Sequence, residues 1–124
     1  DDNNKPGDIT IDDPGVVAIT IKKKDLKISI KSATKKKKSK TAKIVLSNSK
    51  VKKSIRKNVK YQIRYSIKKS MKKCKTKTYK TTKIKLKKMK AGKKYYIKAR
   101  AFVKGINGKK IYGAWTKAKR IKLK

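Results

Sequence analysis

The chain has 124 residues, of which 43 are Lys or Arg and only 6 are Asp or Glu, so its formal charge is +37. This length suits one domain with an additional arm or linker. The sequence contains no His, no Glu and a single cysteine, so it excludes an intrachain disulfide. It also lacks the acid–base pair or ligand cluster that catalysis or a metal site needs. We therefore expect a protein without enzymatic activity, cofactor or metal.

The charge is divided unevenly along the chain. All six acidic residues lie in residues 1–25, and residues 26–124 contain none. No salt bridge can form within that second part, so apolar burial and backbone hydrogen bonds must hold it together against its own repulsion. Exposed charges are screened beyond about 8 Å at physiological salt. We therefore expect the body of the protein to be more stable at high salt or with a polyanion bound.

The N-terminal part differs from the rest. Residues 1–7 are polar with Pro and Gly, which is typical of a linker. Residues 8–21 hold two β-prone pieces, Ile9–Ile11 and Val16–Ile21, separated by an Asp-Asp-Pro-Gly turn. We expect either an extra hairpin or an extended arm here. The predicted domains are thus an acidic arm or linker over residues 1–23 and a β-domain over residues 24–124.

From Leu26 onward, apolar and polar residues alternate in short runs separated by turn signals, as in all-β domains. Thr34–Lys40 is expected to be a loop, Ser49–Asn58 is polar and Lys-rich, and no segment has a convincing helical period. The Asn-Gly pair near residue 107 predicts a hairpin turn. Seven strands are expected: Leu26–Ile30, Ala42–Ser47, Tyr61–Ser66, Cys74–Tyr79, Thr81–Leu86, Tyr95–Phe102, and a last strand made of Ile111–Trp115 and Arg120–Leu123.

The clearest strand belongs to the segment Leu86–Phe102, where a corner at Gly92 precedes a run of period two. Its alternate apolar residues predict a central strand of the core. Tyr96 and Phe102 interrupt the polar face of this strand. Together with Tyr112 they would form either an aromatic ledge for a ligand or a cover over lysine stems and the last strand.

This order of motifs resembles a fibronectin type III domain, especially the Lys-rich versions in surface and secreted proteins of Gram-positive bacteria. The resemblance is carried by Tyr61–Ser66, Leu86–Ala101, Asn107–Lys110 and Tyr112–Thr116. It implies a seven-stranded antiparallel sandwich of two sheets, immunoglobulin-like, and a secreted or cell-surface location.

The resemblance also implies particular structural roles. The Tyr95 hydroxyl would bond to the backbone near Met89, and Cys74 would be buried. The family has a core tryptophan where this chain has Leu46–Asn48, so either that strand is shifted in register or Trp115 and the tyrosines fill the core. The residues expected to be structural are Tyr95, Met89, Trp115, Tyr61, Ile63 and Cys74.

The lysines are the one feature that indicates a function. Lysine is a mobile point charge, and the chain has only four Arg, so its pattern favours sequence-independent attraction to polyanions over base reading. Teichoic acid, acidic glycans, extracellular nucleic acid and anionic lipid headgroups qualify as partners. The alternative is a solvated surface produced by the codon usage of an AT-rich genome. The residues expected to bind are Lys35, Lys36, Lys37, Lys38, Lys87, Lys88, Lys90, Lys93, Lys94 and Arg100.

Two other functions remain open from the sequence. The β-prone, acidic residues 8–21 would suit a structural subunit that assembles by adding a strand to a neighbouring copy. An intracellular nucleic-acid-binding protein has the least support, because Arg is scarce. The chain has no apolar run of about 18 residues for a transmembrane helix and no signal-peptide pattern at its start.

Overall fold

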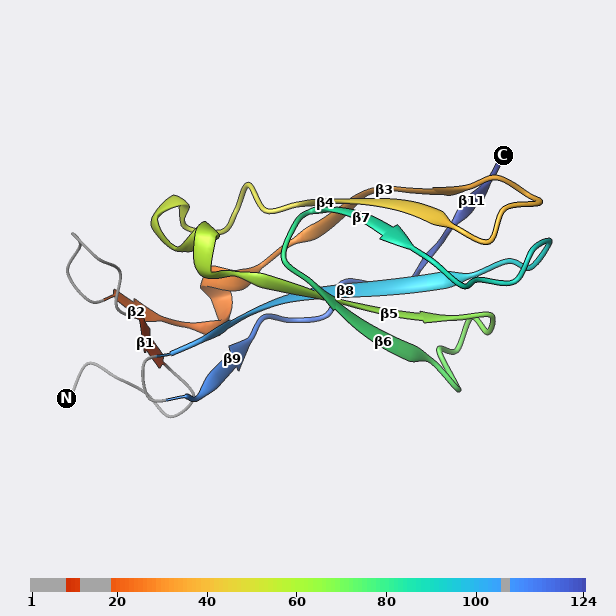
Figure 1. The fold of residues 1–124 in the computed structure, drawn as a ribbon. Helices are drawn as coiled ribbons and strands as arrows, with labels where there is room; N and C mark the ends of the chain where they lie inside the picture. Colours follow the sequence, from red (N-terminus) through yellow and green to blue (C-terminus); the bar gives the residue numbers. More distant parts are fainter. Residues whose placement is uncertain (1–8, 12–18, 106–107) are drawn as a thin grey trace.

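The protein is built from two facing β-sheets, seen in a computed structural model that describes residues 9–11, 19–105 and 108–124 (Figure 1). One sheet contains β5 (Lys60–Ser66), β6 (Lys75–Tyr79), β8 (Tyr96–Lys104), β9 (Lys110–Tyr112) and β10 (Lys119–Arg120), with the order β10-β8-β5-β6 and β9 beside β8. The other contains β3 (Ser29–Lys35), β4 (Ala42–Ser47), β7 (Lys83–Leu86) and β11 (Lys122–Leu123), in the order β11-β3-β4-β7. The expected all-β architecture with two sheets is confirmed.

The number of strands differs from the seven expected, since the two sheets of the described part hold nine. The difference lies in the last predicted strand, which is divided into β9, β10 and β11. After Gly113 the chain leaves the regular ladder, and β10 then pairs with Tyr96 and Ile97 of β8. Ile121 is buried in the core, and beyond it β11 crosses to the other sheet. There β11 pairs in parallel with β3. The prediction of a wholly antiparallel sandwich was therefore wrong at this pair.

A β-bulge in β3 changes which side chains face the core. The pairing with β4 shifts between Ile30 and Ser32, which leaves Lys31 as the extra residue. An extra residue exchanges the two faces of the strand. Before the bulge Ile28 and Ile30 point inward, whereas after it Ala33 and Lys35 take the inward positions.

One apolar core fills the space between the sheets. Its central members come from β4, β5 and β8, as the alternating patterns predicted. Tyr61 and Ile63 are buried there, and Leu46 occupies the region where the resemblance placed a missing tryptophan. The largest fully buried side chains are Ile21, Leu26, Ile44, Ile55, Ile63, Leu86, Ile97, Ile121, Val51 and Val103.

Two short 3-10 helices, η1 (Lys23–Leu26) and η2 (Lys53–Asn58), correct the expectation of a chain without helix. The polar stretch Ser49–Asn58 therefore has a defined path. Val51, Ile55 and Val59 recur every four residues and are buried in the core. Arg56 binds the carbonyls of Val51 and Ser49, each at 3.0 Å. The spacing of these three apolar residues is present in the sequence, but the stretch was not recognised as helical because lysines dominate the positions between them.

The N-terminal region forms the hairpin that was one of the two expectations. β1 (Ile9–Ile11) and β2 (Ile19–Ile21) pair antiparallel. The Ile21 side chain belongs to the main core, so the core begins inside the range 1–23 that was expected to be an arm. The remainder of that range, 1–8 and 12–18, lies outside the described residues, as does the Asn107 part of the predicted hairpin turn.

The residues expected to be structural have different positions. The Tyr95 hydroxyl accepts a hydrogen bond of 2.8 Å from the Lys90 amide, next to the buried Met89. Cys74 is a free thiol and is only partly buried, in contrast to the buried position expected. Trp115 is also only partly buried and lies outside the core, which is filled by aliphatic residues and tyrosines.

Candidate functional site

Two lysine clusters that are far apart in the sequence meet at one end of the sandwich. The loop after β3 and the loop after β7 are joined by two backbone hydrogen bonds. The Met89 amide donates to the Lys40 carbonyl at 2.9 Å, and the Gly92 amide donates to the Lys37 carbonyl at 2.8 Å. The Lys37 amide in turn donates to the Lys124 carbonyl at 2.9 Å. Three separate segments thus converge in one place, although the sequence could not show that they would.

The second loop is held in shape while its lysines point outward. Met89 is buried and anchors the middle of the loop, and the hydrogen bond from Lys90 to Tyr95 holds the following residue. Lys88 and Gly92 have φ values of 61° and 72°, in the left-handed region, which allows the backbone to turn twice within a few residues. A backbone fixed at these points presents its lysines from defined positions.

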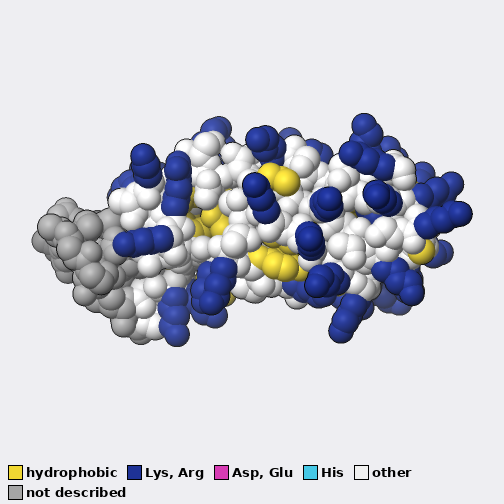
Figure 2. Space-filling view, turned by 45° about the horizontal axis from the view of Figure 1, so that its top comes forward, with side chains coloured by type: hydrophobic (Ala, Val, Ile, Leu, Met, Phe, Trp, Pro, Cys, Tyr) yellow, Lys and Arg dark blue, Asp and Glu magenta, His cyan; other side chains and the backbone are white. Residues whose placement is uncertain are grey.

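We call the resulting surface the lysine end, and it lies opposite the β1–β2 hairpin. Figure 2 shows the blue side chains gathered there, with others scattered over the rest of the visible face. No acid follows Asp25 in the sequence, so no carboxylate of the body neutralises it. Its exposed members among the predicted binding residues are Lys36, Lys37, Lys38, Lys87, Lys88, Lys90, Lys93 and Lys94.

Lys35 does not belong to this surface, because its side chain is only 2% exposed. The bulge at Lys31 places it on the core side of β3. Its ammonium group reaches back to the carbonyls of Lys36 and Lys37, at 3.3 Å and 3.4 Å. The sequence predicted a loop over Thr34–Lys40 and therefore four exposed lysines, but β3 continues to Lys35.

Arg100 lies elsewhere, on the outer face of the five-stranded sheet. Its guanidinium carbon is 4.0 Å from the centre of the Tyr112 ring and 4.3 Å from that of Trp115. Arg64 approaches the same Trp115 ring at 4.4 Å. We call these four side chains the arginine–aromatic row. Because cation–π contacts favour Arg over Lys, the row explains why two of the four arginines stand here.

The two arginines of the row donate hydrogen bonds to side chains of the protein itself. Arg100 Nε donates to Gln62 Oε1 at 2.8 Å, and Arg64 Nε donates to Thr76 Oγ1 at 3.3 Å. Partial burial lowers the pKa of Arg100 from its ordinary value, and repulsion from Arg64 adds to this, while Tyr112 opposes it. The guanidinium groups are therefore held by rings and side-chain oxygens of the same face of the sheet.

Phe102 and Tyr112, two of the three rings considered for an aromatic ledge, pack against each other. Phe102 is buried, and its ring lies 5.2 Å from that of Tyr112, which is half-buried. Lys110 lies over the Phe102 ring at 5.6 Å. Phe102 is therefore covered by Tyr112 and Lys110 and offers no exposed ring face to a ligand.

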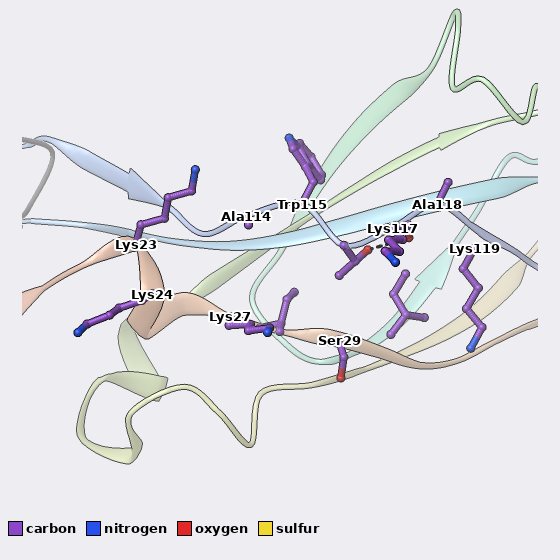
Figure 3. Close-up of a pocket in the computed structure, with 12 residues that line it drawn as sticks. Lys23, Lys24, Lys27, Ser29, Ala114, Trp115, Lys117, Ala118 and Lys119 are labelled. Atoms are coloured by element: carbon purple, nitrogen blue, oxygen red, sulfur yellow. Dashed lines mark hydrogen bonds between the residues drawn. The ribbon is translucent and has the colours of Figure 1, made fainter.

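A cleft that sequence reasoning missed runs along the seam between the two sheets. It has a volume of about 850 Å³ and lies between residues 23–30 and residues 114–119. Figure 3 shows these two segments on opposite sides, with Lys24, Lys27 and Ser29 from one and Ala118 and Lys119 from the other. We call it the seam cleft. No sequence pattern joins these two segments, because they lie on different sheets.

The described residues hold no group of three or more Cys, His, Asp or Glu side chains that would bind a metal. Within the same part of the chain, no helix has the length and apolar character needed to cross a membrane. Comparison with known protein families gives no match for this chain, and comparison with curated proteins gives none either.

Proposed function

We propose that the protein is a non-enzymatic binding module that attaches to anionic polymers through the lysine end. The supporting observation is that eight exposed lysines from two distant loops converge on one surface. Residues 26–124 contain no Asp or Glu that could neutralise them. A polymer that binds there releases its condensed counterions, and this favours binding without sequence recognition. Wall teichoic acid, acidic glycans and extracellular nucleic acid are the candidate ligands.

A fibronectin type III-like sandwich is part of the same proposal. The two-sheet arrangement and the hydrogen bond accepted by Tyr95 support it. A secreted or cell-surface location is proposed from that resemblance, since such domains act as spacers and binding modules outside the cell. The scattered lysines of the other faces would add long-range attraction, and the lysine end would form the closest contacts.

Heparin and duplex DNA are suitable probes, with association measured over a range of NaCl concentrations. We expect log K to decrease linearly with log[NaCl]. A triple variant, Lys87→Gln with Lys90→Gln and Lys93→Gln, should weaken binding and reduce the DNA slope by about 2.7 if three phosphate contacts are lost. The matched control changes three exposed lysines in and before η2, Lys50→Gln, Lys52→Gln and Lys53→Gln.

The control variant has the same net charge as the first but leaves the lysine end intact. We expect it to retain most of the affinity and of the salt slope. Affinity that does not change with salt would contradict the polyanion proposal. Equal losses in the two triple variants would show that attraction is spread over the whole surface, and this would contradict the assignment of the lysine end as the binding site.

A further inference from the structure

We propose that the seam cleft is a docking site for an extended acidic peptide, which adds a strand to the free edge of β3. This inference does not rest on polyanion binding at the lysine end. It concerns a different surface, different backbone groups and a short polypeptide ligand.

The backbone of Ile30 faces the seam cleft. Ile30 lies opposite Leu46 in the antiparallel pair of β3 and β4. The Leu46 amide donates to the Thr82 carbonyl, on the side of β4 away from β3. In an antiparallel pair, two opposed residues direct their backbone groups either toward each other or apart. The N–H and C=O of Ile30 therefore point away from β4 and toward the cleft.

No described strand pairs with this part of β3 on its second edge. β11 pairs with β3 only at Thr34 and Lys35. On the far side of the cleft, the amides of Gly113 and Thr116 donate to carbonyls of β8. These two amides therefore point away from β3 and do not bond to it. The cleft thus lies between two strand edges that are not joined along Ser29–Ala33, which is the arrangement that strand addition uses.

Two contacts limit the length of a strand that binds along the free edge of β3. At one end Gly113 packs directly on the Leu26 backbone, and at the other end the ladder of β11 with β3 begins. The free stretch between these limits, Ser29–Ala33, accommodates about five residues, a common strand length. The cleft volume of about 850 Å³ lies within the range of pockets that hold small ligands.

The lining of the cleft specifies the side chains of the peptide. Its apolar surface comes from Ile28, Ile30 and two alanines, whereas five lysines surround it. A strand places alternate side chains on opposite faces. A peptide in which apolar and acidic residues alternate therefore directs one set to the apolar lining and the other to the lysines. The surrounding lysines are Lys23, Lys24, Lys27, Lys117 and Lys119.

The free backbone distinguishes a peptide from other anionic ligands that have an apolar part. An anionic amphiphile would satisfy the lysines and the apolar lining, but it would cover the Ile30 amide without a hydrogen-bond partner. A buried donor without a partner costs about 1–3 kcal/mol. A peptide strand provides the carbonyl that this amide needs, and so the geometry favours the peptide.

The test uses the full chain and an acetylated, amidated Val-Asp-Val-Asp-Val peptide at physiological salt. Trp115 is the single tryptophan of the chain and belongs to a segment that lines the cleft, so its fluorescence provides a signal for binding. We expect a saturable change. Ala118→Glu places a negative charge in the cleft and should weaken binding by about tenfold or more. Ala91→Glu makes the same substitution at an exposed alanine of the lysine end and should change affinity less than about twofold.

A peptide of the same sequence with every backbone amide N-methylated separates the two kinds of ligand. It keeps the charges and the apolar side chains but cannot donate to a strand edge, and we expect it to bind at least about tenfold more weakly. Equal binding of the two peptides would overturn strand addition and would indicate a site for an anionic amphiphile. Equal effects of the two glutamate substitutions would overturn the placement of the site in the seam cleft.

Discussion

Replacement of Gly113 by alanine tests how the last segment of the chain closes against the N-terminal half of the core. A Cβ atom at this position would lie 2.4 Å from the Leu26 carbonyl oxygen and 3.0 Å from the Leu26 carbonyl carbon. Real Cβ contacts are about 3.4–4 Å, so η1 and the segment after β9 must move apart by about 1 Å. The closest atoms belong to backbone and cannot rotate away.

The cost follows from what this displacement disturbs. Leu26 is fully buried, and burial of a leucine contributes about 1.5–3 kcal/mol. Forcing extra volume into a packed region costs about 1–3 kcal/mol. We therefore expect Gly113→Ala to lower the free energy of unfolding by about 3 kcal/mol. For a domain of this size, each kcal/mol corresponds to about 3–6 °C in Tm.

Urea unfolding followed by Trp115 fluorescence measures the effect, with Gly92→Ala as the matched control. Gly92 has a φ of 72°, but no heavy atom lies within 4 Å of its added Cβ. Its substitution therefore costs only the left-handed backbone strain, about 1 kcal/mol. A Gly113→Ala variant as stable as Gly92→Ala, with the same dependence on urea, would refute the close packing of Gly113 on Leu26.

Three further predictions concern the charges and the corner. Lys35→Met should stabilise the fold by about 1 kcal/mol, because it replaces a buried cation by an apolar side chain of similar length. The control Lys36→Met, at an exposed position, should change the urea midpoint little. A Lys35→Met variant that is less stable than the unchanged protein would contradict the buried placement of Lys35. Tyr95→Phe should lower the free energy of unfolding by about 1 kcal/mol and accelerate hydrogen exchange of the Lys90 amide, because this amide loses its acceptor. Unchanged exchange would show that the hydrogen bond from Lys90 to Tyr95 does not form. Stability should rise with NaCl, because salt screens repulsion among lysines without paired carboxylates; a midpoint independent of salt would show that the repulsion is negligible.

Much of the fold could be predicted from local pattern. The alternating apolar residues located the strands that became β4 to β8. The first predicted strand, Leu26–Ile30, was misplaced: it overlaps β3 only at Ser29 and Ile30, because Leu26 ends η1. The bulge at Lys31 could not be predicted, because one extra residue in a strand leaves no mark in a sequence where lysines fill both faces. That single residue decided that Lys35 is buried and removed it from the predicted binding surface.

The position of Trp115 shows the same limit from another side. The resemblance made a core position for Trp115 one of two alternatives, but the chain after Gly113 runs along β8 at the edge of the sheet. There the Trp115 ring contacts Arg64 and Arg100 instead of the core. Composition indicates that a large ring must be covered, but only the path of the backbone determines whether aliphatic groups or guanidinium groups cover it.

The sequence by itself determined that this protein is an all-β chain with a strongly cationic body, since alternation and residue type are local properties. Tertiary structure decided which lysines lie together. The loops that hold Lys37 and Lys90 are about fifty residues apart, and they meet because β4 and β7 pair along their length. The seam cleft has the same origin, since its two sides come from different sheets and exist only where those sheets face each other without a joining strand.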